Sequence, residues 1–219
     1  TVVPLAWATA HGCIVLAGLS PPRAVQMRGA VLWPSVLWLV PGMLLGAVVA
    51  SIGVVRWAGP GLRWAVIVYC LLVALQLLGN WPKARNIETA RAVGWPWTAL
   101  GLVIGAVSSV VGIGGGSMTV PALISRGVPA VKAVATSAAC GVFIALASAF
   151  TYSQLPNPHA MPAYSIGYVY LPAAIGVALT SIAFAPLGAR WAHQVSAQTL
   201  KRLFAGFLMA MALLLVVTT

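Results

Sequence analysis

Long apolar stretches recur along the whole chain, and they constrain its fold more than any other feature of the sequence. They are Val2–Leu19, Val31–Val55, Leu62–Gly79, Trp97–Val111, Val131–Phe150, Gly167–Gly188 and Leu203–Val217. Several approach the roughly 20 residues that an α-helix needs to cross a bilayer. Only 6% of the residues are charged, against about 25% in soluble domains. The sequence therefore predicts an all-α, polytopic transmembrane helix bundle of about seven segments.

One apolar region is interrupted by the sequence GIGGGS at residues 112–117. Backbone groups that lose their helical hydrogen bonds are costly in lipid, so such a break persists only inside protein or beside a cavity. A short helix over residues 117–126 would follow the break, and the partial positive charge at its N-terminus favours an anion. The alternative is that the glycines only allow close helix packing. Four glycines within residues 112–116 exceed what packing needs, so we expect an anion site.

Two stretches of the chain resemble each other. LAWATAHGCIVLAG (residues 5–18) aligns with KAVATSAACGVFIA (residues 132–145) at an offset of 127. Further on, the pair Arg56–Trp57 matches Arg190–Trp191 at an offset of 134. Such two-fold repeats are how many transporters build a central site between their halves.

The alignment divides the chain into three parts. Residues 1–85 are the first repeat, residues 86–96 a basic connecting loop, and residues 97–219 the second repeat, which opens with the glycine-rich break. The first repeat has no counterpart of that opening segment, so a further stretch about as long as residues 97–131 is expected upstream of Thr1.

Lysine and arginine positions test whether the chain turns back at the glycines. If residues 97–127 crossed the membrane once, the basic residues would divide seven against five between its two sides. If they form a re-entrant hairpin, the division becomes ten against two. Because basic residues collect on the cytoplasmic side, the sequence favours a hairpin and inverted repeats in a bacterial inner membrane. Loops 20–30, 80–96 and 189–202 are then cytoplasmic.

Residues 101–143, GLVIGAVSSVVGIGGGSMTVPALISRGVPAVKAVATSAACGVF, resemble the signature of the sulfite exporter TauE/SafE family. In that family a glycine-rich GxGGG precedes a short proline-containing segment and a helix that starts with A(V)ATS. Members are polytopic inner-membrane proteins associated with movement of sulfite, sulfonates and related anions. The resemblance implies a permease for a small inorganic or organosulfur anion, with the lipid bilayer as its surroundings and no cofactor. The chain departs from the family in lacking the glycine-rich loop of the first repeat.

The resemblance also implies which residues bind the anion, through backbone N–H groups and hydroxyls. They are Gly112, Gly114, Gly115, Gly116, Ser117, Thr119, Thr136, Ser137, Thr9 and His11. An ionised sulfur oxyanion carries acceptor oxygens and no donors, so N–H and O–H groups suit it. His11 is the one histidine well inside an apolar stretch, where an ionisable group is a functional candidate. A neutral histidine that is hydrogen-bonded across helices is the alternative.

Several other functions fit the sequence poorly. The net charge of +11 is spread over short loops, so no nucleic-acid partner is expected. No paired carboxylates, metal-ligand cluster or Ser/His/Asp set is visible, which predicts no catalytic residue, no metal site and no enzyme. The one acidic residue is Glu88, in a loop, so anion movement would be passive or coupled through His11. The alternative function is a structural or accessory transmembrane subunit derived from a permease, and a homo-oligomer or a larger membrane complex would suit it.

Overall fold

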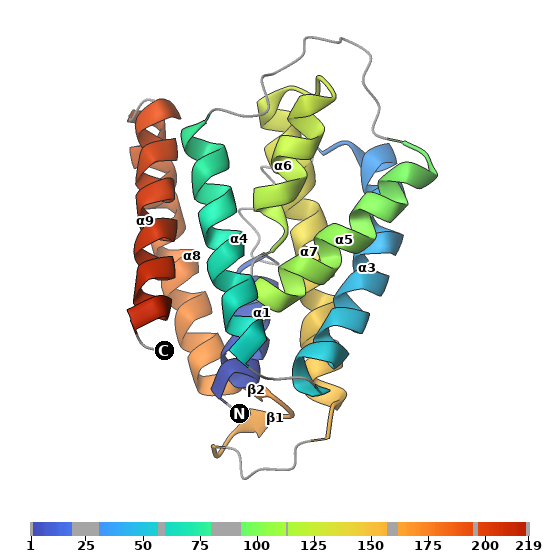
Figure 1. Cartoon of the computed structure of the whole chain (residues 1–219), viewed down its shortest axis with the longest axis vertical. Coiled ribbons are helices and arrows are strands. Elements are labelled where there is room, and N and C mark those ends of the chain that lie inside the picture. Colours follow the sequence, from blue (N-terminus) through green and yellow to red (C-terminus); the bar gives the residue numbers. More distant parts are fainter. Residues whose placement is uncertain are drawn as a thin grey trace.

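The computed structural model describes residues 2–18, 31–56, 60–79, 93–112, 114–156, 162–194 and 197–217. Within them, the helices are α1 (Val2–Gly18), α3 (Trp33–Arg56), α4 (Pro60–Leu78), α5 (Trp95–Val111), α6 (Gly116–Ser125), α7 (Ala130–Gln154), α8 (Leu171–Gln194) and α9 (Ala197–Val217). Two short antiparallel strands, β1 (Ser165–Ile166) and β2 (Val169–Tyr170), connect α7 to α8. The predicted all-helical class is confirmed (Figure 1).

Several of these helices have the composition of membrane spans. Those long and apolar enough to cross a bilayer are Trp33–Arg56, Gly61–Leu78 and Val131–Gln154. Shorter apolar helices are Leu5–Gly18, Trp95–Val111, Leu171–Phe184 and Arg202–Val217. Large apolar side chains such as Leu72 of α4, Leu179 of α8 and Phe207 of α9 are exposed on the outside of the bundle, as lipid contact requires. The number of about seven membrane segments remains a prediction, because fewer helices reach full spanning length.

The helices form one bundle whose long axis is vertical in Figure 1. Helix α1 packs against α7 and α8, α3 packs against α5 and α7, and α4 packs against α9. Helix α5 crosses the bundle obliquely. The main core lies where α3, α5, α6 and α7 meet, around the fully buried side chains of Leu39, Met43, Ile104, Leu123 and Ile144.

Helices α3 and α5 touch backbone to backbone. The contact is made by two glycines on each helix: Gly42 and Gly46 on α3, Gly101 and Gly105 on α5. A Cβ atom at any of these positions would overlap a carbonyl oxygen of the facing helix. Glycines four residues apart are the spacing that lets membrane helices approach this closely. The contact fixes α5, and with it the start of the glycine-rich break, on α3.

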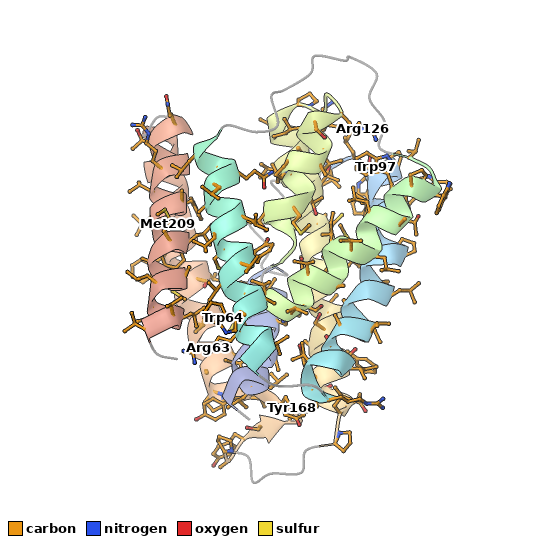
Figure 2. All side chains as sticks on the ribbon, viewed as in Figure 1. Arg63, Trp64, Trp97, Arg126, Tyr168 and Met209 are labelled. Carbon is orange, nitrogen blue, oxygen red and sulfur yellow. The ribbon has the colours of Figure 1, made fainter. Side chains whose placement is uncertain are left out.

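Helices α5 and α6 form a hairpin whose outer ends meet. Arg126 directly follows α6, and its guanidinium lies 5.5 Å from the ring centroid of Trp97 in the first turn of α5. Figure 2 shows both residues at the upper end of the bundle. The chain therefore enters along α5, breaks at the glycines and returns along α6 to the end from which it came. This is the broken-helix hairpin expected over residues 97–127.

Replacing Gly46 by alanine is expected to destabilise the protein, because the added methyl group would overlap the Leu102 carbonyl oxygen of α5. Overpacking of this kind costs on the order of 1–3 kcal/mol, which lowers the midpoint of thermal unfolding by several degrees. The matched control is Gly53→Ala on the same helix, where nothing lies within 4 Å of the Cβ position. Thermal unfolding in detergent, followed by circular dichroism, compares the two. Equal midpoints would contradict the proposed role of the α3–α5 contact.

Candidate functional site

The glycine-rich break joins α5 to α6 inside the bundle (Figure 1). Helix α5 ends at Val111, and Gly112 adopts a φ of +79° while its N–H donates to the Ser108 carbonyl at 2.9 Å. Gly115 adopts a φ of +71° immediately before α6. Side-chain-bearing residues rarely adopt such angles, so the two glycines make the turn. Ile113, between them, lies outside the described residues.

The N-terminus of α6 has no capping side chain. The Gly115 carbonyl accepts hydrogen bonds from the Thr119 N–H at 3.0 Å and the Thr119 hydroxyl at 2.8 Å. Within the described chain, the N–H groups of Gly116 and Ser117 donate to no backbone carbonyl. The end of the helix therefore presents two N–H donors and the positive end of its dipole to the interior, which is the arrangement that binds anions.

Two hydroxyls lie at this helix end. The Ser117 hydroxyl is hydrogen-bonded to the phenol of Tyr69 on α4. The Ser137 hydroxyl of α7 lies 3.5 Å from the position that a Cβ would take on Gly116, and Ser137 is only 2% exposed. The structure thus brings together Gly115, Gly116, Ser117, Thr119 and Ser137 of the expected set. The Thr119 hydroxyl is already used inside the turn, so the remaining donors are backbone N–H groups and serines.

Helix α7 supports the break from the other side. Gly141 lies against Gly114, and a Cβ at Gly141 would overlap the Gly114 carbonyl oxygen. Helix α1 closes the remaining side, because the Trp7 ring lies 3.2 Å from the Cβ position of Gly112. The irregular backbone is therefore enclosed by protein, as a membrane interior demands.

The expected hydroxyls of Thr9 and Thr136 have structural partners. The Thr136 hydroxyl accepts a hydrogen bond from the Leu32 N–H at 2.9 Å, which fixes the residues that lead into α3. The Thr9 hydroxyl donates to the Leu5 carbonyl at 2.7 Å and accepts from the Tyr170 N–H at 3.1 Å. These bonds hold β2 against α1.

An open cavity of about 650 Å³ lies beside the break, between α1, α7 and α8. Its wall includes Thr9, Gly112, Gly114, Ala138 and Ser181. The cavity exists because many of the residues around it have small side chains. Thr9 and Ser181 contribute the hydroxyl groups of its wall. The glycines of the break therefore form part of a cavity wall, next to the side chain of Ile14.

His11 faces away from this cavity. Its side chain is fully buried, and Nδ1 lies 2.9 Å from the Trp7 carbonyl oxygen one turn earlier in α1. The His11 ring lies 6.1 Å, centroid to centroid, from the Tyr152 ring of α7. His11 is not among the described residues that line the cavity. The structure therefore separates it from the other expected residues.

Sequence reasoning missed two polar residues at the break. Tyr69 of α4 reaches Ser117 from another helix. The hydroxyl of Ser108, on α5, lies 3.3 Å from the Cβ position of Gly115, and Ser108 is 4% exposed. Both are polar residues within apolar stretches of the sequence, and this feature could have identified them as candidate site residues.

Comparisons with known proteins agree with this architecture. The family model described as "Sulfite exporter TauE/SafE" matches residues 2–215. A protein of Haemophilus influenzae named "Probable membrane transporter protein" is 32% identical over 209 residues, which are 94% of this chain and 78% of that protein. No solved structure matches the chain significantly.

Replacing Gly141 by alanine is expected to destabilise the protein by displacing the Gly114 carbonyl, with a cost on the order of 1–3 kcal/mol. Gly116→Ala is the stability control, because the nearest atom to its Cβ position is the Ser137 hydroxyl oxygen at an ordinary 3.5 Å. Thermal unfolding of the two purified variants checks this difference. A Gly141→Ala midpoint equal to that of Gly116→Ala would mean that α7 does not support the break.

Proposed function

The chain belongs to the sulfite exporter TauE/SafE family of membrane transporters, and on this premise we propose that it is a permease for small sulfur-containing anions such as sulfite or a sulfonate. The observation that carries the proposal is the uncapped N-terminus of α6, with the N–H groups of Gly116 and Ser117, at a break inside the bundle. The function is movement of an anion, not its chemical conversion.

In this proposal the oxygens of the anion accept hydrogen bonds from the N–H groups of Gly116 and Ser117 and from the hydroxyls of Ser117 and Ser137. Tyr69 orients the Ser117 hydroxyl from α4. Broken helices of transporters present their half-helix N-termini to anionic substrates in the same way. Gly112 and Gly114 form the adjoining cavity wall, through which the anion reaches the helix end. Thr9 and Thr136 hold the surrounding elements in place.

The packing of the helices supports the inverted repeat. In the two repeats α1 corresponds to α7, α3 to α8, and α4 to α9. A two-fold repeat therefore requires that α1 packs on α8 if α3 packs on α7, and both pairs do pack. The pairs α1–α7 and α4–α9 exchange onto themselves, and both of these pack as well. We therefore retain residues 1–85 and 97–219 as the two repeats, with 86–96 as their connection; of that connection, residues 86–92 lie outside the described residues.

The uneven division of lysine and arginine residues between the two sides, ten against two, supports a location in a bacterial inner membrane. Arg126 and Arg63 lie toward opposite ends of the bundle (Figure 2). We propose that the end carrying Arg126 is cytoplasmic, together with loops 20–30 and 80–96 and with residues 189–202. Residues 189–202, expected as a loop, are instead the end of α8, which runs to Gln194, and the start of α9, which begins at Ala197. Loop 20–30 and most of loop 80–96 lie outside the described residues.

The direct test is flux of radiolabelled sulfite into liposomes that hold the purified chain, with the membrane potential set by a potassium gradient and valinomycin. Saturable uptake above that of protein-free liposomes is expected for the wild type. It should be lost in Gly115→Leu, because leucine cannot adopt the φ of +71° and would collide with Ile144. Circular dichroism and gel filtration establish that the variant is folded. Absence of uptake by well-folded wild-type protein would refute the permease and favour an accessory subunit.

A milder variant tests the helix end itself. Ser117→Ala removes one hydroxyl and its bond to Tyr69, and a lost hydrogen bond is worth about 0.5–1.5 kcal/mol. The KM for sulfite should therefore rise roughly two- to twelvefold. Ser125→Ala is the control on the same helix, because the Ser125 hydroxyl donates to the Ala122 carbonyl in the last turn of α6. Equal KM values for both variants would place the anion elsewhere.

Cysteine labelling tests the orientation. Lys132→Cys near the start of α7 and Ala163→Cys just before β1 introduce thiols at exposed positions. The native cysteines Cys13, Cys70 and Cys140 are buried and need no replacement. In intact cells, a membrane-impermeant maleimide should label the thiol at position 163, whereas position 132 should react only after permeabilisation. The reverse pattern would invert the proposed orientation.

A further inference from the structure

A second polar site lies in the bundle, apart from the glycine-rich break. His11 is fully buried, and its Nδ1 lies 2.9 Å from the Trp7 carbonyl oxygen. A carbonyl only accepts, so Nδ1 carries the hydrogen and donates it. The other ring nitrogen, Nε2, is then a bare acceptor, and it has no hydrogen-bond partner although it is completely buried. Such an atom is rare in folded proteins, and a functional role or a bound water or ion is among the explanations for it.

A second buried polar atom without a hydrogen-bond partner, the Ser51 hydroxyl oxygen, lies near His11. Ser51 of α3 is fully buried, and its hydroxyl makes no hydrogen bond of acceptable geometry. That hydroxyl approaches the phenol of Tyr152 on α7, whose ring also faces His11. We call His11, Ser51 and Tyr152 the histidine cluster. Three helices thus contribute one polar side chain each to a region from which external water is excluded.

Hydroxyls extend from the histidine cluster toward the break. The Tyr152 hydroxyl lies 3.4 Å from the Ser109 carbonyl oxygen, and the Ser109 hydroxyl is hydrogen-bonded to that of Ser148 at 2.6 Å. Ser109 is next in the chain to Ser108, whose hydroxyl faces Gly115. Along α1, Trp7 contacts Gly112 and also accepts the His11 hydrogen bond. The histidine cluster is therefore connected to the break by two short paths, one through Ser109 and Ser108 and the other through Trp7.

The charges around His11 define what it can bind. The sequence places its one acidic residue, Glu88, outside the apolar stretches, so no carboxylate accompanies the imidazole. Several elements around His11 carry titratable or charged residues. They are Cys13 on its own helix, Arg56 at the end of α3, Arg63, Tyr69 and Cys70 on α4, Lys132, Cys140 and Tyr152 on α7, Tyr168 and Tyr170 at the β-hairpin, and Arg190 and His193 near the end of α8. None of them is an anion near neutral pH. A proton on His11 therefore lacks a negative partner unless an anion enters the bundle.

We propose that the histidine cluster is a proton-binding site, reached through bound water, that takes up one proton when an anion occupies the break. This deepens the proposed function, on which it rests, by making the permease a proton–anion cotransporter. The proton comes from water on one side, binds the lone pair of Nε2 and leaves to water on the other side. Nδ1 keeps its hydrogen and its bond to Trp7 throughout, and no bond within the anion forms or breaks.

Proton uptake is coupled to anion binding because the two charges stabilise each other. An unpaired charge of either sign is costly in an apolar interior, and a pair of opposite charges is less so. Imidazole is the side chain that exchanges a proton most readily near neutral pH. The positive charge of a protonated His11 has no counter-charge among the side chains around it, and an anion at the break supplies one. Binding of the two ions is therefore cooperative, and by linkage each raises the affinity for the other.

The transport test uses methanesulfonate, whose charge is fixed between pH 5 and 8, so that any proton that moves belongs to the protein. Liposomes holding the whole chain are clamped at zero potential and given a gradient of 1 pH unit. One proton per anion should concentrate labelled methanesulfonate about tenfold on the alkaline side. His11→Gln should abolish this accumulation, because glutamine carries no exchangeable charge. The control variant, with both His159→Gln and His193→Gln, should retain it.

The same control variant supplies a readout that is independent of transport, because His11 is then the only histidine. In ¹⁵N NMR spectra, adding methanesulfonate at constant pH should move the Nε2 resonance from its deprotonated toward its protonated position. Ser51→Ala and Tyr152→Phe should weaken that response. Ser153→Ala is the control and should not, because the hydroxyl of Ser153 donates to the Phe150 carbonyl and is not part of the histidine cluster. Sulfite or methanesulfonate flux that follows potential alone, with no NMR response, would overturn the proposal and leave the permease intact. Absence of any anion flux would instead refute the proposed function.

Discussion

A bilayer offers no water to the backbone, so every irregular segment inside it depends on protein contacts for its stability. The break at residues 112–116 is the segment of this chain to which that constraint applies most severely. Helix α7 approaches it through Gly141, α1 covers it with Trp7, and α4 reaches it through Tyr69. The surrounding bundle is therefore arranged around one piece of backbone. The N–H groups of Gly116 and Ser117 have no intrahelical acceptor because they belong to the first turn of α6, which has no capping side chain.

Much of the fold followed from local properties of the sequence. Apolar runs predict helices, and the glycines at 112–116 predict the break, because both are set by residues close together in the chain. The hairpin over residues 97–127 was predicted from the distribution of loop charges, and the meeting of Trp97 with Arg126 bears it out. Charge bias can indicate such a turn because it sums over many loops and does not depend on any single contact.

The site was predicted less completely, for a physical reason. The family resemblance assigned the hydroxyls of Ser117 and Thr136 to the site, and in the structure their partners are Tyr69 and Leu32, which are distant in sequence. No periodicity within one helix reveals which face meets another helix. The separation of His11 from the break has the same origin. It follows from the rotation of α1 about its axis, which the packing against α7 and α8 determines.

The glycine contact between α3 and α5 has a mechanical consequence. Two backbones that meet without interlocking side chains resist separation, but they resist rotation across each other much less. At the outer end, however, the Thr98 hydroxyl of α5 is bonded to the Trp38 carbonyl of α3 at 2.8 Å, and the adjacent Trp97 is joined to the end of α6 through Arg126. Helix α5 is therefore held at its outer end by side chains as well as by the glycine contact. Any displacement of α5 relative to α3 would be smallest at Thr98 and largest at Gly112, where the break begins.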